Sequence, residues 1–266
     1  MASRTKQKEE ARARRLAEER ARAEKARRDR RIRTVGGIVL GAIIVVAVLI
    51  VVNSGGNKGG IKTGTEATAT ATAVDQMFAG IPQSGATLGN PNAPVTMTYF
   101  GDYECPVCQE FTLQGGFPEL VQNEVRQGKV KVVYKSFCTA TCNGPNPSIF
   151  PTQQVAGLAA GKQEKFWQYT ELFYRQQGQE DTGYVNEAYL TALARQVIGM
   201  NLTTWQSDRN DASLTSQIAS DQTDAKNAGV SGTPQLIFQG PTGHQASPPE
   251  SVPTYSELQQ AIKQVS

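Results

Sequence analysis

Two cysteines stand two residues apart in the segment Cys105-Pro106-Val107-Cys108. This spacing serves three kinds of chemistry: a pair of metal ligands, a structural staple, or a redox centre that forms and breaks its own disulfide. Proline after the first cysteine is typical of the first residue of a helix, where its missing N–H needs no partner. We therefore expect Cys105 to be the N-cap of a helix and Cys108 to lie in its first turn.

A cysteine at a helix start is chemically activated. The thiolate is the nucleophile in disulfide exchange, and the unpaired N–H groups of the first turn stabilise a sulfur anion together with the positive end of the helix dipole. We expect Cys105 to be the exposed sulfur that attacks and is attacked. Cys108 is expected to lie beneath it and to close the disulfide ring.

Two alternatives explain the same spacing. A zinc site could use all four cysteines, with Cys138 and Cys142 completing a four-thiolate set. Zinc knuckles usually lie in hairpins with glycine close behind the second cysteine, whereas residues 109–113 continue a helix. A purely structural disulfide between Cys105 and Cys108 would close a very short loop, so its stabilisation would be at the weak end of the range for disulfides. The residues favour redox chemistry, with a redox-active disulfide and no metal or other cofactor.

Cys138 and Cys142 form the second pair, in a predicted loop. Four cysteines permit three pairings, and we expect the local one. A structural disulfide is the simpler role, while a second redox pair that relays electrons remains open. The single histidine, His244, lies in a turn rich in glycine and proline, so a hydrolase with a Cys-His pair is not favoured.

The elements around the first pair form a β-α-β unit. Residues 94–100 alternate and are rich in β-forming side chains, which predicts a strand, and a second strand is predicted at 130–135. Between them, the helix that begins at the CPVC segment is interrupted at Gly115-Gly116 and restarts through to about residue 126. This order places the CPVC segment at the first strand-to-helix junction.

The rest of the chain is predicted as a helical block, then a strand and a helix. Helical patterning extends over residues 148–227. A loop at 229–234 leads into an apolar strand at 235–239, and Thr254-Tyr-Ser-Glu257 matches the capping box of a last helix.

Charge divides the chain into unlike parts. Residues 1–33 carry fourteen Lys/Arg and six Asp/Glu, a net of +8, whereas the rest of the chain has a net of −5. The overall charge of +3 describes neither part, so it gives no reason to expect a nucleic-acid partner. Residues 34–52 contain no charged side chain and, as a helix, are about long enough to cross the hydrocarbon core of a bilayer. We predict a basic arm at 1–33 and a transmembrane helix at 34–52.

The basic arm also predicts the orientation in the membrane. Cytoplasmic flanks of membrane helices carry the excess of Lys and Arg, so we expect a single-pass protein in the cell membrane with a cytoplasmic N-terminus. Residues 53–84 are rich in Gly, Ser, Thr and Ala, and are predicted to be a flexible linker. The catalytic domain, at 85–266, would then lie on the extracytoplasmic side, where disulfides persist.

Three separate segments carry a resemblance to a known family. The segment from Ala93 to the CPVC motif, the Lys165-Phe-Trp segment and Gly229-Val-Ser-Gly-Thr-Pro234 resemble the DsbA-like branch of the thioredoxin superfamily over about residues 85–266. Membrane-anchored disulfide oxidoreductases of bacterial cell envelopes are the most similar in layout. The resemblance implies an α/β thioredoxin-like fold with an inserted helical subdomain at about 148–228. In that family the proline at the place of Pro234 is cis and faces the redox pair, so Thr233 and Pro234 are expected to bind the substrate strand.

The sequence departs from the family pattern near the first cysteine. Strongly oxidising members have a histidine between the cysteines, where this chain has Val107, and a buried carboxylate six residues before the first cysteine, where it has Tyr99. In addition, Glu104 adjoins Cys105, and a nearby anion raises a thiol pKa. We expect the pKa of Cys105 to be depressed less than in the strongest oxidases, which makes the couple less oxidising.

The sequence thus predicts an extracytoplasmic oxidoreductase that exchanges disulfides with protein thiols, acting as an oxidase. The resemblance implies a quinone-linked membrane partner that reoxidises it, of the DsbB or vitamin-K-epoxide-reductase type. Two alternatives stay open: a disulfide reductase or isomerase, and a non-catalytic thioredoxin-fold binding module of the cell envelope.

Overall fold

The computed structural model describes residues 60–266. The predicted basic arm at 1–33, the predicted transmembrane helix at 34–52 and the first residues of the predicted linker lie outside this range. Within residues 60–266, every helix is too short or too polar to cross a bilayer.

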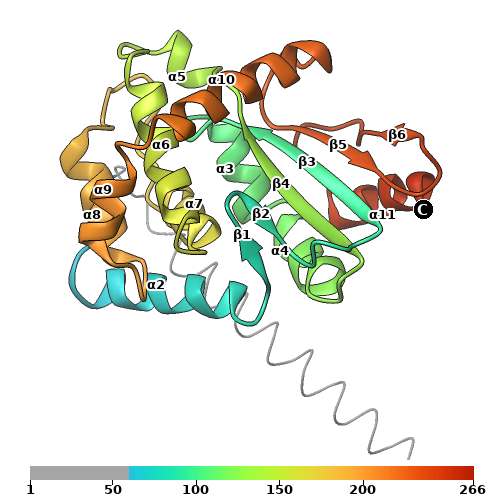
Figure 1. The fold of residues 1–266 in the computed structure, drawn as a ribbon, viewed down its shortest axis with the longest axis horizontal. Helices are drawn as coiled ribbons and strands as arrows, with labels where there is room; N and C mark the ends of the chain where they lie inside the picture. Colours follow the sequence, from blue (N-terminus) through green and yellow to red (C-terminus); the bar gives the residue numbers. More distant parts are fainter. Residues whose placement is uncertain (1–59) are drawn as a thin grey trace, which may run out of the picture. The chain divides into compact units, whose positions relative to one another are not determined.

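The described chain contains a mixed sheet and a larger set of helices (Figure 1). The strands are β1 (Gln83–Ser84), β2 (Thr87–Leu88), β3 (Val95–Gly101), β4 (Val130–Ser136), β5 (Gln235–Gln239) and β6 (Gln245–Ala246). The helices are α2 (Gly64–Phe78), α3 (Pro106–Leu113), α4 (Phe117–Leu120), the π-helical turn η1 (Val121–Val125), α5 (Ala140–Asn143), α6 (Ile149–Gly161), α7 (Phe166–Arg175), α8 (Glu187–Gln196), α9 (Leu202–Asp208), α10 (Ala212–Asn227) and α11 (Tyr255–Val265).

The sheet has the order β1-β2-β4-β3-β5-β6. β3 and β4 pair in parallel, from Val95 opposite Val130 onward, and α3 connects them as predicted. β5 pairs with β3 in the antiparallel direction, with Gln235 opposite Phe100. This register brings the residues before β5 to the end of β3 at which the CPVC segment begins. Two segments far apart in the sequence therefore meet at the carboxyl end of β3.

The helical block between β4 and β5 forms a subdomain of its own (Figure 1). α6 to α9 lie together beside the sheet, and α11 lies near β5 and β6. Within the subdomain, α6 contacts α7, α9 and α10, while α7 also contacts α3. The insertion therefore packs directly against the helix that carries the cysteine pair.

The predicted linker is wrong for residues 64–84. These residues form α2, a turn and β1. One face of α2 buries Ala67, Thr70, Ala71, Val74 and Phe78, a helical spacing that packs against α7 and α8. Most of these side chains are Ala or Thr, which resemble low-complexity sequence, so the stripe is weak in composition although it is buried in the fold.

Candidate redox site

Cys105 has the helix-start position that the sequence predicts. It is the N-cap of α3, with φ −73° and ψ 117°, and Pro106 is the first helical residue. The Cys105 sulfur accepts a hydrogen bond from the Cys108 N–H at 3.4 Å. The side chain is more buried than expected: Cys105 is 5% exposed and Cys108 is fully buried.

The loop before β5 provides the opposite wall of the site. The Thr233–Pro234 peptide bond is cis, as the family resemblance implies. The Cys105 thiol lies 3.3 Å from the Thr233 carbonyl oxygen and donates to it. The four residues that the sequence singled out for exchange chemistry are therefore brought together.

The two thiols differ in their tendency to ionise. A hydrogen bond from the Cys108 thiol is the largest of the effects that lower the pKa of Cys105 to about 7, and contacts with Thr233 and with the first-turn N–H groups add to it against the opposing effect of burial. Burial raises the pKa of Cys108 well above its ordinary value. Cys105 is therefore the sulfur that forms a thiolate near neutral pH.

Tyr99 lies under the cysteine pair, where stronger oxidases have a carboxylate. Its side chain is fully buried, and its hydroxyl lies 3.4 Å from the Cys108 carbonyl oxygen and 3.1 Å from the Thr112 hydroxyl. Burial raises the pKa of Tyr99 well above its ordinary value, so the hydroxyl stays protonated. It supplies a polar contact beneath Cys108 and no charge.

Glu104 is less strongly charged than its type suggests. Burial, followed by the nearby charge of Asp102, raises the pKa of Glu104 to about 7. A side chain with this pKa is about half protonated at neutral pH, so its average repulsion of a Cys105 thiolate is smaller than that of an ordinary glutamate.

Cys138 and Cys142 form the local disulfide that the sequence predicts, with Cα atoms 5.6 Å apart. Cys105 and Cys108 are free thiols. Because two of the four sulfurs are joined to each other, they are not available as thiolate ligands, which argues against the four-cysteine zinc site. Whether the Cys138–Cys142 disulfide is structural or takes part in redox chemistry stays a prediction.

Two residues of the site were missed from the sequence. Asp102 is fully buried and accepts hydrogen bonds from backbone N–H groups on both sides of the site. Gln177, which follows α7, donates to the Cys105 carbonyl oxygen at 3.1 Å and ties the helical insertion to the start of α3. The position of Asp102 between the predicted strand and the CPVC segment was a usable signal, whereas nothing local to Gln177 indicates its contact.

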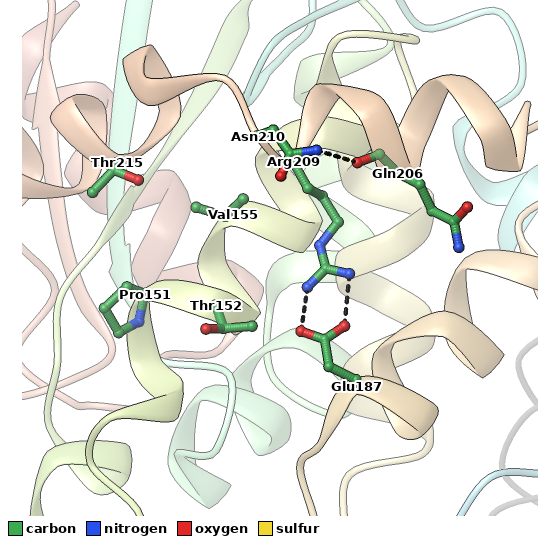
Figure 2. A pocket seen from close by; sticks show the side chains of 8 residues that line it. All are labelled: Pro151, Thr152, Val155, Glu187, Gln206, Arg209, Asn210 and Thr215. Carbon is green, nitrogen blue, oxygen red and sulfur yellow. Dashed lines mark hydrogen bonds and ion pairs between the residues drawn. The ribbon is translucent and has the colours of Figure 1, made fainter.

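A hollow lies on the insertion, between α6, α8, α9 and α10 (Figure 2). Its most prominent polar contact is an ion pair in which Arg209 donates to both oxygens of Glu187, at 2.8 and 2.7 Å. The guanidinium also lies over the ring of Trp205, 4.8 Å from the centroid. The charge of Arg209 is therefore neutralised within the protein, and the side chains that line this hollow include no cysteine, histidine or lysine.

Known proteins resemble this chain in sequence and in structure. The model of a family described as thioredoxin matches residues 83–264. The probable disulfide bond formation protein D of Bacillus cereus is 24% identical over 172 residues, which cover 62% of this chain and 74% of that protein.

Two solved structures share the architecture. BdbD from Bacillus subtilis, in its oxidised form, has a TM-score of 0.56 at 21% identity and matches 68% of this chain and 91% of its own. α-DsbA1 from Wolbachia pipientis has a TM-score of 0.55 at 15% identity and matches 68% of this chain and 89% of its own. At these identities the structural likeness concerns the fold.

Proposed function

This chain belongs to the thioredoxin family, has a thioredoxin-like α/β fold with a helical insertion and is a disulfide oxidoreductase, and on that premise we propose that it oxidises protein thiols through Cys105 and Cys108. The oxidising direction is supported by the B. cereus relative, which is named for disulfide bond formation. The observation that carries the assignment of the two residues is the helix-start geometry, with the Cys105 sulfur 3.4 Å from the Cys108 N–H and 3.3 Å from the Thr233 carbonyl oxygen.

The proposed reaction begins from the Cys105–Cys108 disulfide. A substrate thiolate attacks the Cys105 sulfur, the enzyme disulfide breaks, and Cys108 leaves as a thiolate that takes up a proton. This step forms a mixed disulfide between the substrate and Cys105. A second substrate thiolate then attacks the substrate sulfur of the mixed disulfide, which forms the substrate disulfide and releases the Cys105 thiolate. Two electrons have passed from the substrate to the enzyme.

The pKa of Cys105 and the burial of Cys108 support these roles. A low pKa makes Cys105 a good leaving group in the second step, and burial keeps Cys108 away from competing thiols. Thr233 and Pro234 are proposed to hold the substrate strand, because Pro234 has no N–H and the loop lies against the Cys105 sulfur.

A reductase or isomerase is the second candidate, and a specific observation favours it. The pKa of Cys105, at about 7, lies where that of thioredoxin does and well above that of the most acidic family member. Reoxidation of reduced ribonuclease, measured beside insulin reduction, separates the two directions. The proposal predicts that ribonuclease gains disulfides faster than insulin loses them, with Cys105→Ser inactive in both assays. Fast insulin reduction without ribonuclease oxidation would show that the chain acts as a reductase and not as an oxidase.

The location and the redox partner are also proposals. The uncharged segment 34–52 and the basic arm 1–33 support a membrane anchor with the catalytic domain on the extracytoplasmic side. A quinone-linked membrane protein of the DsbB or vitamin-K-epoxide-reductase type would then return the couple to its oxidised form. Labelling of Cys105 by a membrane-impermeant thiol reagent in intact cells tests whether the catalytic domain is extracytoplasmic. A cytoplasmic domain would be labelled only after lysis.

A further inference from the structure

The segment closed by the second disulfide, residues 138–142 and here called the 138–142 loop, lies against the redox site. Its Thr139 hydroxyl is hydrogen-bonded to the Thr233 hydroxyl. The Thr233 carbonyl oxygen accepts a hydrogen bond from the Cys105 thiol at 3.3 Å, and a side-chain hydrogen bond from Thr233 lowers the pKa of Cys105. The loop therefore reaches the reactive thiol through one intervening residue.

The buried carboxylate of Asp102 holds the 138–142 loop in this place. Its Oδ2 accepts from the N–H groups of Thr139 and Thr141 at 2.8 and 3.0 Å. Its Oδ1 accepts from the Glu104 N–H at 3.1 Å and from the Thr141 hydroxyl. A single carboxylate thus fastens the loop to the turn that leads into α3, and every one of these contacts uses it as an acceptor.

The chemistry of the two threonine hydroxyls gives this contact a direction. Each hydroxyl has one proton to donate. A thiolate at Cys105 needs a donor, so the Thr233 proton is directed to the sulfur only when Thr139 donates to the Thr233 oxygen. Because a donor that is itself a hydrogen-bond acceptor becomes more polarised, Thr139 strengthens the stabilisation of the thiolate.

We propose that Asp102 and Thr139 are positioning residues of the redox site, through which the disulfide-closed 138–142 loop orients the Thr233 hydroxyl toward Cys105 and favours the reduced enzyme. This inference rests on the proposed exchange at Cys105 and Cys108. It gives the second disulfide a role in tuning the first pair without any electron transfer between them.

The test compares three variants with the wild-type chain. Thr139→Val keeps the shape and removes the hydroxyl, and Cys138→Ser/Cys142→Ser opens the loop. Thr242→Val is the matched control, because it removes a hydroxyl that donates to the Val265 carbonyl oxygen at 3.1 Å, in the turn between β5 and β6. Circular dichroism confirms that each variant is folded. The equilibrium of the Cys105/Cys108 couple with glutathione and the pH profile of Cys105 alkylation are then measured.

We expect Thr139→Val to shift the equilibrium toward the enzyme disulfide by about two- to tenfold, the range of one net hydrogen bond. The midpoint of its alkylation profile should move to higher pH. The double serine variant should shift both measurements in the same direction, and Thr242→Val should change neither. If Thr139→Val and the double serine variant are folded and match the control in both measurements, the positioning role is wrong. A wild-type chain whose Cys105 and Cys108 fail to equilibrate with glutathione would instead contradict the proposed function.

Asp102→Asn tests whether the Asp102 carboxylate holds the 138–142 loop in place. Asparagine replaces one acceptor oxygen by an NH₂ donor, so N–H groups that now face a carboxylate oxygen would face a donor. We expect a shift at least as large as that of Thr139→Val and in the same direction. An unchanged equilibrium in folded Asp102→Asn would remove Asp102 from the proposal.

Discussion

The chain has two cysteine pairs that are close in sequence and opposite in character. Cys138 and Cys142 are joined, with Cys142 at the surface, whereas Cys105 and Cys108 are free and almost completely buried. Exposure alone would therefore favour the second pair, whereas the proposed reactive thiol belongs to the first.

The difference comes from the local backbone. The first pair begins α3, which packs against α4 and α7, and first-turn N–H groups and the Cys108 thiol are directed at the Cys105 sulfur. The second pair closes a short loop around α5, a helix of only four residues. The proposal assigns disulfide exchange to the first pair because of the hydrogen-bond donors directed at the Cys105 sulfur.

The largest expected contrast is in activity. Cys105→Ser should reduce thiol–disulfide exchange to the background rate, because it removes the attacking and attacked sulfur. Cys138→Ser/Cys142→Ser should keep turnover, with at most the shift in equilibrium proposed above. Ribonuclease reoxidation measures both. Equal loss of activity in the two variants would contradict the assignment of disulfide exchange to the first pair alone.

Alkylation should distinguish the two thiols within the first pair. With a pKa of about 7, Cys105 is half ionised at neutral pH, whereas burial keeps Cys108 almost entirely protonated. Iodoacetamide should therefore modify Cys105 at least about a hundredfold faster at pH 7, with a rate that rises through pH 7 and then levels off. Peptide mapping identifies the modified residue, and preferential modification of Cys108 would contradict this order.

The free energy of unfolding should depend on the second pair, in contrast to activity, which should depend on the first. The Cys138–Cys142 disulfide closes a loop with a sequence separation of 4, for which the chain-entropy estimate gives a loss of about 2 kcal/mol on removal. Cys138→Ser/Cys142→Ser should therefore unfold at lower urea concentration than the wild-type chain. An unchanged midpoint would mean that the disulfide has no structural role.

The smallest expected effect is on the pH dependence of stability, and it comes from Glu104, which adjoins the first pair. Because the pKa of Glu104 is raised to about 7 in the folded chain, the folded state binds more protons than the unfolded state between about pH 4.5 and 7. Wild-type stability should fall over that range. Glu104→Gln should be more stable than the wild type above pH 7 by about 1–2 kcal/mol, allowing for screening by water, and equal to it below about pH 4.5.

Urea unfolding at several pH values tests this prediction. Glu110→Gln is the control, since Glu110 lies on α3, which follows Glu104 in the chain, and has an exposed side chain. A Glu104→Gln curve that runs parallel to the wild-type curve at every pH would show that Glu104 is not the titrating group.

The sequence predicted the parts of the fold and site that depend on local signals. Pro106 marked the helix start, and the Thr254 capping box marked the last helix, as the structure confirms. The local Cys138–Cys142 pairing was also predicted correctly.

Contacts between distant segments were harder to predict. α2 was predicted as linker because its buried face is mostly Ala and Thr, and its stability comes from packing on α7 and α8. The burial of Cys105 and the contacts of Asp102 with Thr139 depend on how the β3, β4 and β5 ends meet. Such contacts have no periodicity that a single sequence could show.

The most direct test of the account follows all four sulfurs at once. The wild-type chain is equilibrated with glutathione buffers of increasing reducing strength, quenched with acid, alkylated and mapped by mass. We expect Cys105 and Cys108 to pass reversibly between disulfide and dithiol while Cys138 and Cys142 stay joined. A chain in which Cys138 and Cys142 carry the reversible change, while Cys105 and Cys108 never pair, would contradict the account.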